Sequence, residues 1–278
     1  MLVDIAVYDK FNNSLLLTKV DTTNPGTVII YIGGMLSDMM HPKFVFDMAD
    51  KMHFASFVQP ILRSHPFFGL WSLADDAEDI ERVIEHVCKN FRREFSKGMT
   101  VDTAHGNSAE YSELPKIILL GHSTGCQSVL HYLNTRLHSS KITCAIFLGP
   151  VSDREYEESV NPNLSYKLEL ARNNPEMTFL HFNSPVKAQR YISLFTKYGD
   201  DDLFSSDLPN EFFKTLNKSG TPLHFLVMRD DEYMLKSNVD CLRLVNNADV
   251  RVIGGDHVFG GGVDEMFGVL SEIVQKYH

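Results

Sequence analysis

Short apolar runs recur along the chain and alternate with stretches of helical spacing. Residues 2–8 and 14–20 predict an opening pair of strands, with Asn12 and Asn13 supplying turn chemistry between them. The continuous apolar run at 26–34 is typical of a strand that is buried on both faces of a parallel sheet. Further strands are predicted at 55–62, 116–120, 142–151, 221–228 and 249–255.

The segments between these strands carry the spacing of helices. From Leu73 to Phe91, apolar residues recur every three or four positions, which predicts an amphipathic helix. Ser72 with Asp75 resembles a capping box, with Asp in place of Glu. A helix is also predicted after the 116–120 strand, through about His138, and another at 263–277, whereas the polar stretch 98–113 predicts a surface loop. Strands that alternate with helices predict an α/β fold with a mostly parallel central sheet.

One long segment interrupts this alternation. Residues 153–219 lack buried-strand runs and are rich in charged residues, asparagine and aromatic residues. We therefore expect a single domain over residues 1–278, with a helical cap at 153–219 inserted after the sixth core strand.

Composition and charge narrow the classes of partner. With 44% hydrophobic residues, the chain can form a sizeable core, and its formal net charge of -10 disfavours nucleic acid and anionic membranes as partners. We find no secretory signal and no apolar run long enough to span a bilayer. The four cysteines are scattered, which predicts free thiols in a reducing, cytoplasmic compartment, and no residue spacing indicates a metal or a cofactor. The sequence does not indicate the oligomeric state.

A candidate nucleophile lies directly after a predicted strand. Gly121, His122, Ser123, Thr124 and Gly125 form G-x-S-x-G between a β-branched strand and an apolar helix. This is the strand–turn–helix context of a nucleophile elbow, in which the residues two before and two after the serine must be small. We interpret Ser123 as a nucleophile, against the alternative of an ordinary serine in a tight turn.

A serine hydroxyl needs a base, which is in turn oriented by an acid. His257 follows the predicted strand 249–255, and Asp231 follows the strand 221–228, so both lie where ligands gather in open α/β sheets. Asp231 is preferred as the acid, while Asp230 and Glu232 remain alternatives.

The negative oxygen of an acyl-transfer intermediate requires backbone N–H donors. The residue after the nucleophile, Thr124, is the first expected donor. The loop Gly33–Leu36 is expected to supply the second, from Met35 or alternatively Leu36, with Gly34 allowing close approach to the substrate. The alternative is that these glycines serve only a tight turn.

Further contacts with the substrate are expected from two other places. Trp71 closes an apolar stretch, residues 67–71, that either lines the substrate pocket or packs the cap onto the core. Arg154 and Asp153 follow the strand 142–151, where they either anchor the cap by an ion pair or touch the substrate, and anchoring is preferred. We assign Gly34, Leu36, Trp71 and Arg154 as candidate substrate-binding residues.

With these residues identified, the chain resembles a branch of the α/β-hydrolases, a largely uncharacterised eukaryotic family that includes fungal siderophore esterases. The resemblance extends over most of the chain and implies an α/β-hydrolase fold and a triad of Ser123, Asp231 and His257. It rests on the segments GHSTGCQ (121–127), SLADDAEDI (72–80), PVSDRE (150–155), GDDDLFSSDL (199–208), DDEYM (230–234) and GGDHVF (255–260).

The resemblance also implies the hydrolysis of a small-molecule ester, with siderophore esters as one substrate class. The alternatives are another acyl hydrolase or transferase, such as a thioesterase or lipase, and a non-catalytic binding protein with this fold. Four aspartates of the cap either form an acidic cleft for a cationic substrate or pair with Arg190 and Lys197, and pairing is preferred. They are Asp200, Asp201, Asp202 and Asp207.

Overall fold

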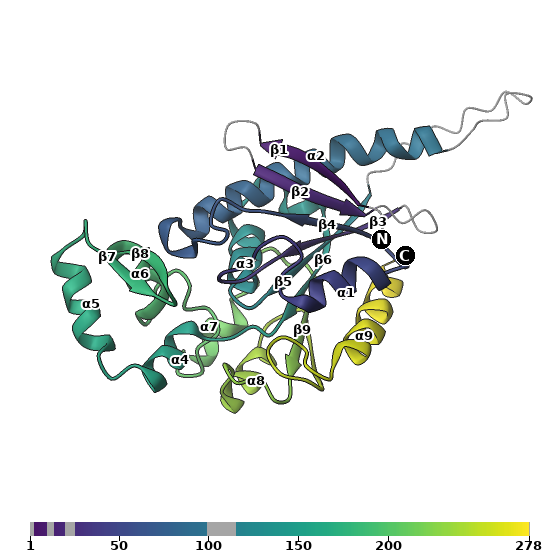
Figure 1. Ribbon diagram of the computed structural model, residues 1–278. Coiled ribbons are helices and arrows are strands. Elements are labelled where there is room, and N and C mark those ends of the chain that lie inside the picture. Colours follow the sequence, from purple (N-terminus) through teal and green to yellow (C-terminus); the bar gives the residue numbers. More distant parts are fainter. Residues whose placement is uncertain (1–2, 10–13, 20–25, 99–114, 278) are drawn as a thin grey trace, which may run out of the picture.

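A central sheet of eight strands organises the chain in this computed structural model, which describes residues 3–9, 14–19, 26–98 and 115–277 (Figure 1). The strand order is β1-β2-β4-β3-β5-β6-β9-β10. The strands are β1 (Asp4–Asp9), β2 (Ser14–Lys19), β3 (Thr27–Ile32), β4 (Ser56–Pro60), β5 (Lys116–His122), β6 (Ile142–Leu148), β9 (Leu223–Met228) and β10 (Ala248–Ile253). The turn predicted at Asn12 and Asn13, and nearly all of the loop predicted at 98–113, lie outside the described residues.

The sheet is parallel from β4 to β10, while β1 and β2 extend one edge in antiparallel pairing. All six residues of β3 are buried, as its unbroken apolar run predicts. Val28, Ile30 and Ile32 pack into one core and Ile29 and Tyr31 into the other, because successive side chains of a strand point to opposite faces.

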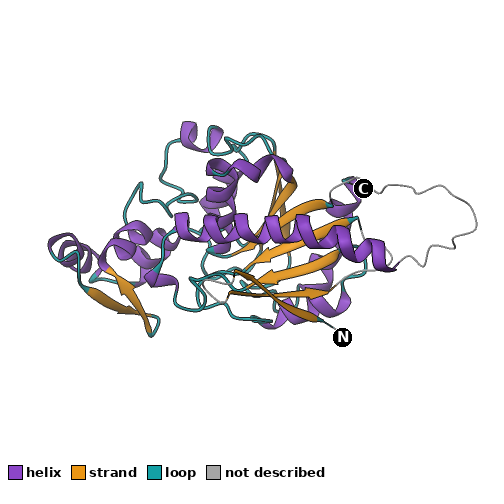
Figure 2. Cartoon of the chain, turned by 90° about the horizontal axis from the view of Figure 1, so that it is seen from above, coloured by secondary structure: helices purple, strands orange, loops and turns teal. Residues whose placement is uncertain are grey.

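Helices cover both faces of this sheet (Figure 2). On one face pack α2 (Leu73–Gly98), α3 (Gly125–Thr135) and α8 (Lys236–Leu242). On the other pack α9 (Val263–Lys276) and α1 (Lys43–Lys51), a helix that the sequence analysis did not identify. Within the described residues, no helix combines the length and apolarity that crossing a membrane would require.

The segment between β6 and β9, which we call the insert (residues 153–219), extends beyond one end of the sheet (Figure 1). Its apolar side chains, among them Leu168, Tyr191 and Phe195, form a small core of their own with Phe68 from the 3-10 turn Phe68–Leu70. The insert contains α4 (Asp153–Val160), α5 (Leu164–Asn173), β7 (Thr178–His181), β8 (Ser184–Lys187), α6 (Ala188–Phe195) and α7 (Asn210–Lys214).

The antiparallel pair β7–β8 departs from the purely helical cap that the sequence predicted. Its two-residue turn places Phe182 and Asn183 at positive φ, 46° and 58°, which is the backbone of the turns that connect short hairpins. Phenylalanine seldom adopts this conformation, so the turn carries no conventional sequence signal.

Candidate active site

Ser123 lies in a tight turn between β5 and α3 with a φ of 55°, a left-handed conformation that is costly for a residue with a side chain. Its backbone N–H donates to the Leu148 carbonyl at 3.0 Å. The two glycines around it are needed for close approach, because a Cβ on Gly121 would lie 2.6 Å from the carbonyl oxygen of Gly125. The turn therefore has the strained geometry and the small neighbours that a nucleophile elbow requires.

His257 and Asp231 follow the ends of β10 and β9, which pair in parallel with Ile253 opposite Met228. The Nδ1 atom of His257 lies 2.9 Å from Oδ2 and 3.0 Å from Oδ1 of Asp231. The Asp231 side chain is fully buried and also accepts the N–H of Tyr233 at 2.9 Å. A proton on Nδ1 facing this carboxylate leaves Nε2 free to accept a proton.

The other two candidate acids are placed differently. Glu232 accepts the backbone N–H of His257 at 3.1 Å, so it contacts the main chain and not the ring. Asp230 is exposed, and its own N–H donates to the Gly255 carbonyl at 3.1 Å. Of the three carboxylates, Asp231 is the one in contact with the imidazole of His257.

His122, beside Ser123 in the sequence, also contacts His257. Its Nε2 lies 2.9 Å from the His257 carbonyl oxygen, and its ring packs against those of Phe44 and His257. Burial, together with the nearby His257, lowers the pKa of His122 to about 3, so this imidazole is neutral near pH 7. The His257 main chain is thus held at its N–H by Glu232 and at its carbonyl by His122.

A cavity of about 210 Å³ opens at this end of the sheet and is lined by Ser123 and His257. One side of it, which we call the core wall, also contains the loop after β3 and the neighbouring Val258. The insert also lines the cavity, with residues that we call the insert wall: Asp153, Tyr156, Glu157, His181, Phe182 and Phe195.

The loop expected to supply the second oxyanion donor lies against the serine turn. A Cβ on Gly34 would lie 2.9 Å from the His122 carbonyl and 3.1 Å from the backbone nitrogen of Thr124, so only glycine fits there without a shift. Gly34, Met35 and Leu36 all line the cavity. The two predicted donor residues, Thr124 and Met35, therefore belong to neighbouring segments beside Ser123.

Trp71 and Arg154, two of the predicted substrate-binding residues, do not line this cavity. Arg154 is 3% exposed and is bound by Asp202 at 3.1 Å and by Glu158 at 3.0 Å, as well as by Asp207. It anchors the insert internally, which is the role that the sequence analysis preferred over contact with the substrate. Trp71 is 40% exposed and lies under the cationic groups of Arg63 and Lys187.

The acidic stretch 200–207 proves to be a network of ion pairs. Asp201 pairs with Arg190, and Asp207 pairs with Lys197 at 2.9 Å, as the preferred interpretation predicted. None of the four aspartates of that stretch lines the cavity. The acids that do so, Asp153 and Glu157, were not identified as a pair from the sequence, although their i, i+4 spacing places them on one face of a helix.

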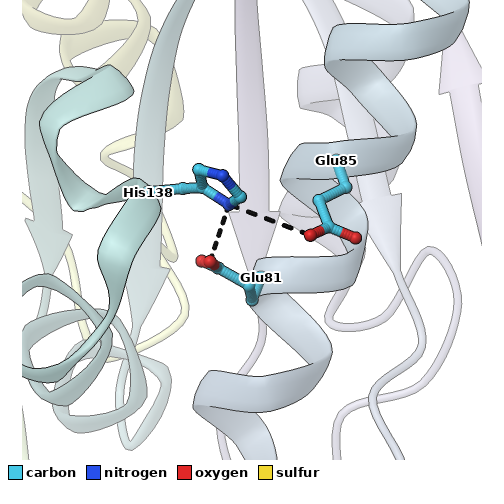
Figure 3. A group of neighbouring side chains, drawn as sticks. All are labelled: Glu81, Glu85 and His138. Carbon is cyan, nitrogen blue, oxygen red and sulfur yellow. Dashed lines mark ion pairs between the residues drawn. The ribbon is translucent and has the colours of Figure 1, made fainter.

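A second cluster of titratable side chains lies away from the cavity (Figure 3). Glu81 and Glu85 extend from α2 toward His138, with Nδ1 of His138 2.6 Å from Glu81 and 3.9 Å from Glu85. Tyr132 donates to the second oxygen of Glu81 at 2.7 Å. One ligand atom from each of Glu81, Glu85 and His138 lies within 4.8 Å of the other two, a geometry that could hold a metal ion. The sequence analysis did not identify this group, because His138 is far from the two glutamates along the chain. The carboxylate–imidazole contact by itself accounts for this arrangement.

Comparison with known proteins supplies two sequence relatives. A UPF0613 protein of Schizosaccharomyces pombe is 26% identical over 246 residues, which cover 79% of this chain and 72% of that protein. Fusarinine C esterase sidJ of Aspergillus fumigatus is 26% identical over 241 residues, which cover 68% of this chain and 64% of the esterase. This chain thus spans about two thirds of the esterase's length.

Solved structures support the fold. Siderophore hydrolase EstB from Aspergillus fumigatus matches with a TM-score of 0.74 at 20% identity, covering 99% of this chain and 96% of EstB. A soluble variant of monoglyceride lipase from Saccharomyces cerevisiae matches with a TM-score of 0.68 at 11% identity, covering 99% of this chain and 96% of the lipase. The predicted α/β-hydrolase fold is confirmed. Residues 6–252 match the family described as "Protein of unknown function (DUF1749)", so this chain belongs to that family.

Proposed function

We propose that this chain is a serine hydrolase that cleaves carboxylic esters. The observation that carries the proposal is the hydrogen-bonded pair of His257 and Asp231, which shares a cavity with Ser123 at a strained strand–helix turn. An imidazole with a buried carboxylate on Nδ1, beside a serine in an elbow, is the arrangement that activates a hydroxyl. The relatives named as an esterase and a siderophore hydrolase support ester chemistry for this site.

The proposed reaction begins when Nε2 of His257 removes the proton from Ser123 Oγ, which attacks the ester carbonyl carbon. The Asp231 carboxylate holds the imidazole in this tautomer and stabilises the imidazolium that forms. The backbone N–H groups of Thr124 and Met35 are proposed to donate to the tetrahedral oxyanion, with Leu36 as the alternative second donor.

Collapse of this intermediate breaks the bond to the alcohol, which leaves with the proton from His257 Nε2. Water then gives a proton to Nε2 and attacks the acyl carbon, and the second collapse releases the acid and returns the proton to Ser123 Oγ. His257 thus serves as base and then as acid in each half-reaction, and the cycle uses only groups of this chain, the ester and water.

The cavity restricts the substrate to an ester with a compact part near Ser123. Its volume of about 210 Å³ is smaller than the roughly 300–1,000 Å³ of pockets that enclose a drug-sized ligand. A larger ester, such as a siderophore ester, would extend over the rim. The rim offers apolar surface at Leu36, Phe182 and Val258, which are 41%, 49% and 46% exposed.

Fluorophosphonate labelling tests the activated serine directly. We expect wild type to label and Ser123→Ala and His257→Ala not to label, while all three remain folded by circular dichroism. Ser37→Ala is the matched control, because it removes another serine hydroxyl that lines the cavity. Folded wild-type protein that does not label would contradict the proposal and favour a non-catalytic binding protein. If wild type labels but hydrolyses thioesters or long-chain esters faster than other esters, the result would favour a thioesterase or a lipase.

A further inference from the structure

Two buried carboxylates of the insert are paired with arginines. Asp201, with a fully buried side chain, pairs with Arg190. Asp202, equally buried, pairs with Arg154 at 3.1 Å. Because a buried charge without a partner is strongly destabilising, such pairing is the usual way to keep a carboxylate ionised inside a protein.

The partly buried Asp153 and the buried Glu157 differ from these two, because among the described residues neither has a lysine or arginine in ion-pair contact. Asp153 Oδ2 accepts from the amide of Gln127 at 2.9 Å, and Glu157 Oε1 accepts from the amide of Asn161 at 2.5 Å. The nearest basic group to Glu157 is His181, at 3.8 Å from Oε2. Burial lowers the pKa of His181, so its imidazole is a neutral partner near pH 7.

Both of these residues line the cavity. They lie four residues apart on α4, so they occupy the same face of that helix. Glu157 is only 4% exposed, and Ser123 and His257 line the same small cavity. A ligand group that enters beside Ser123 therefore encounters two acids whose hydrogen-bond donors are neutral amides.

The rings of two tyrosines add to this environment. Tyr156 from α4 and Tyr233 from the turn after β9 both line the cavity, with ring centroids 4.6 Å apart. The face of an aromatic ring attracts a cation electrostatically, and more strongly where water is excluded. A cavity lined by carboxylates and aromatic residues favours a compact cation over an anion or an extended apolar chain.

We propose that Asp153 and Glu157 form a subsite for a primary ammonium group of the substrate, which they hold beside the ester attacked by Ser123. An ammonium group is compact and has three donors, so it can serve both carboxylates in a cavity of this size. The identity of the reacting group rests on the proposed ester hydrolysis, whereas the subsite rests on the insert wall. A cationic group of the substrate would therefore be bound by α4 and not by the acidic stretch 200–207, three of whose carboxylates pair with arginine and lysine side chains of the insert.

The protonation of Asp153 gives the subsite a pH dependence. Burial, with the negative charge of Asp201 added, raises the pKa of Asp153 to about 8, although Arg190 opposes the shift and Asp202 reinforces it. Near pH 7 the free carboxyl therefore holds a proton, and a bound ammonium group would favour its release. The affinity for an ammonium ligand should rise as the pH approaches about 8, whereas the affinity for a neutral isostere should not.

Binding to the Ser123→Ala variant tests the subsite without any dependence on turnover. The probes are methyl 6-aminohexanoate and methyl heptanoate, which differ by an ammonium group in place of a methyl group, measured by calorimetry at about pH 6 and pH 8. At about pH 8 we expect the ammonium ester to bind at least about tenfold more tightly than its methyl counterpart, which is the size of effect that hydrogen bonds to charged groups produce. At about pH 6 this preference should be smaller. Because the cation can lie on either side of the ester, 5-aminopentyl acetate and hexyl acetate form a second matched pair.

Substitutions then assign the effect to the two carboxyl groups. In the Ser123→Ala background, Asp153→Asn and Glu157→Gln should each reduce the preference for ammonium, and the double variant should bring it close to one. Glu158→Gln is the matched control, because it removes one negative charge from the same helix at a side chain that is 49% exposed and does not line the cavity. It should retain the preference.

Equal binding of the ammonium and methyl members of both pairs would overturn the subsite. So would a preference that survives in the double variant or disappears in Glu158→Gln. Failure of the proposed hydrolysis is a separate result, because wild type would then not label with a fluorophosphonate even if Ser123→Ala discriminated between the two esters.

Discussion

The two walls of the cavity hold their polar groups by different means. On the core wall, Ser123 and His257 are placed by the ends of strands, and main-chain hydrogen bonds to Leu148, Glu232 and His122 fix their backbones. On the insert wall, Asp153 and Glu157 belong to a helix, and the insert itself is bound through buried side-chain ion pairs of Arg154 and Arg190.

We infer that this difference separates the proposed chemistry from the proposed recognition of the ligand. Backbone geometry of a parallel sheet tolerates many side-chain changes, so the proposed reacting groups keep their positions. Ion pairs and a helix face can be altered by one substitution, so the insert wall can change the ligand it accepts without moving Ser123. Variants of the two walls should therefore differ in kind: those of the core wall in turnover, those of the insert wall in stability and selectivity.

The largest effect is expected on the core wall, from Asp231→Asn. An amide accepts poorly from Nδ1 and favours the wrong imidazole tautomer, so kcat on a neutral ester should fall about 10⁴-fold with little change in KM. Asp230→Asn is the matched control, because this neighbouring aspartate is exposed, and its kcat should stay within about twofold. A reversed ranking of the two variants would assign the acid to Asp230.

On the insert side, Arg190→Ala should cost stability. It leaves the fully buried carboxylate of Asp201 without its cation and removes a hydrogen bond to the Phe68 carbonyl, which links the insert to the core. Breaking one partner out of a buried pair costs about 3 kcal/mol of unfolding free energy. Arg243→Ala, which disrupts an exposed pair with Asp240, should change it by less than about 0.5 kcal/mol. Urea unfolding measures both, and equal small losses would contradict the anchoring role of Arg190.

Asp153→Asn should change how stability depends on pH. In the folded protein the pKa of Asp153 is raised to about 8, so between about pH 4 and 8 the folded state holds a proton that the unfolded chain releases. Wild type therefore loses stability relative to the Asn variant as the pH rises through this range. Urea midpoints at about pH 5 and pH 8 measure the effect, and an unchanged difference between the two proteins would show that Asp153 is ionised throughout.

The fold could be predicted from the sequence because its central strands are buried on both faces. Such strands appear as continuous apolar runs, and those at 26–34, 142–151 and 221–228 correspond to β3, β6 and β9. The β7–β8 pair could not be found in this way, since its strands have four residues each and Phe182 occupies a positive-φ turn position. Helix α1 did carry an apolar period, at Phe44, Val45, Met48 and Ala49, that the sequence analysis did not identify.

The site was predictable to different extents on the two walls. Strand ends place Ser123, Asp231 and His257 at one edge of the sheet whatever their side chains do, so their proximity follows from topology. Contacts within the insert depend on side-chain packing across long sequence separations, as between Arg154 and Asp202. That is why Arg154 was assigned to the substrate, and why Asp153 with Glu157 was not identified as a pair.

The smallest effect is expected where the two regions meet, at the start of α2. Ser72 and Asp75 form the predicted capping box: Ser72 N–H donates to Asp75 at 2.9 Å, and Asp75 N–H donates to the Ser72 hydroxyl at 3.3 Å. Ser72→Ala removes the cap and should lower the free energy of unfolding by about 1 kcal/mol. Ser165→Ala, at an exposed position within α5, should change it by less than about 0.5 kcal/mol.

This variant also tests how far the two walls are independent. The capping box of α2 lies next to Trp71 and to the 3-10 turn that packs against the insert, but its residues do not line the cavity. Ser72→Ala should therefore lower the urea midpoint while fluorophosphonate labelling and the preference for ammonium esters are retained. A loss of that preference in the folded variant would mean that the start of α2 positions the insert wall, and recognition would then depend on the core as well as on α4.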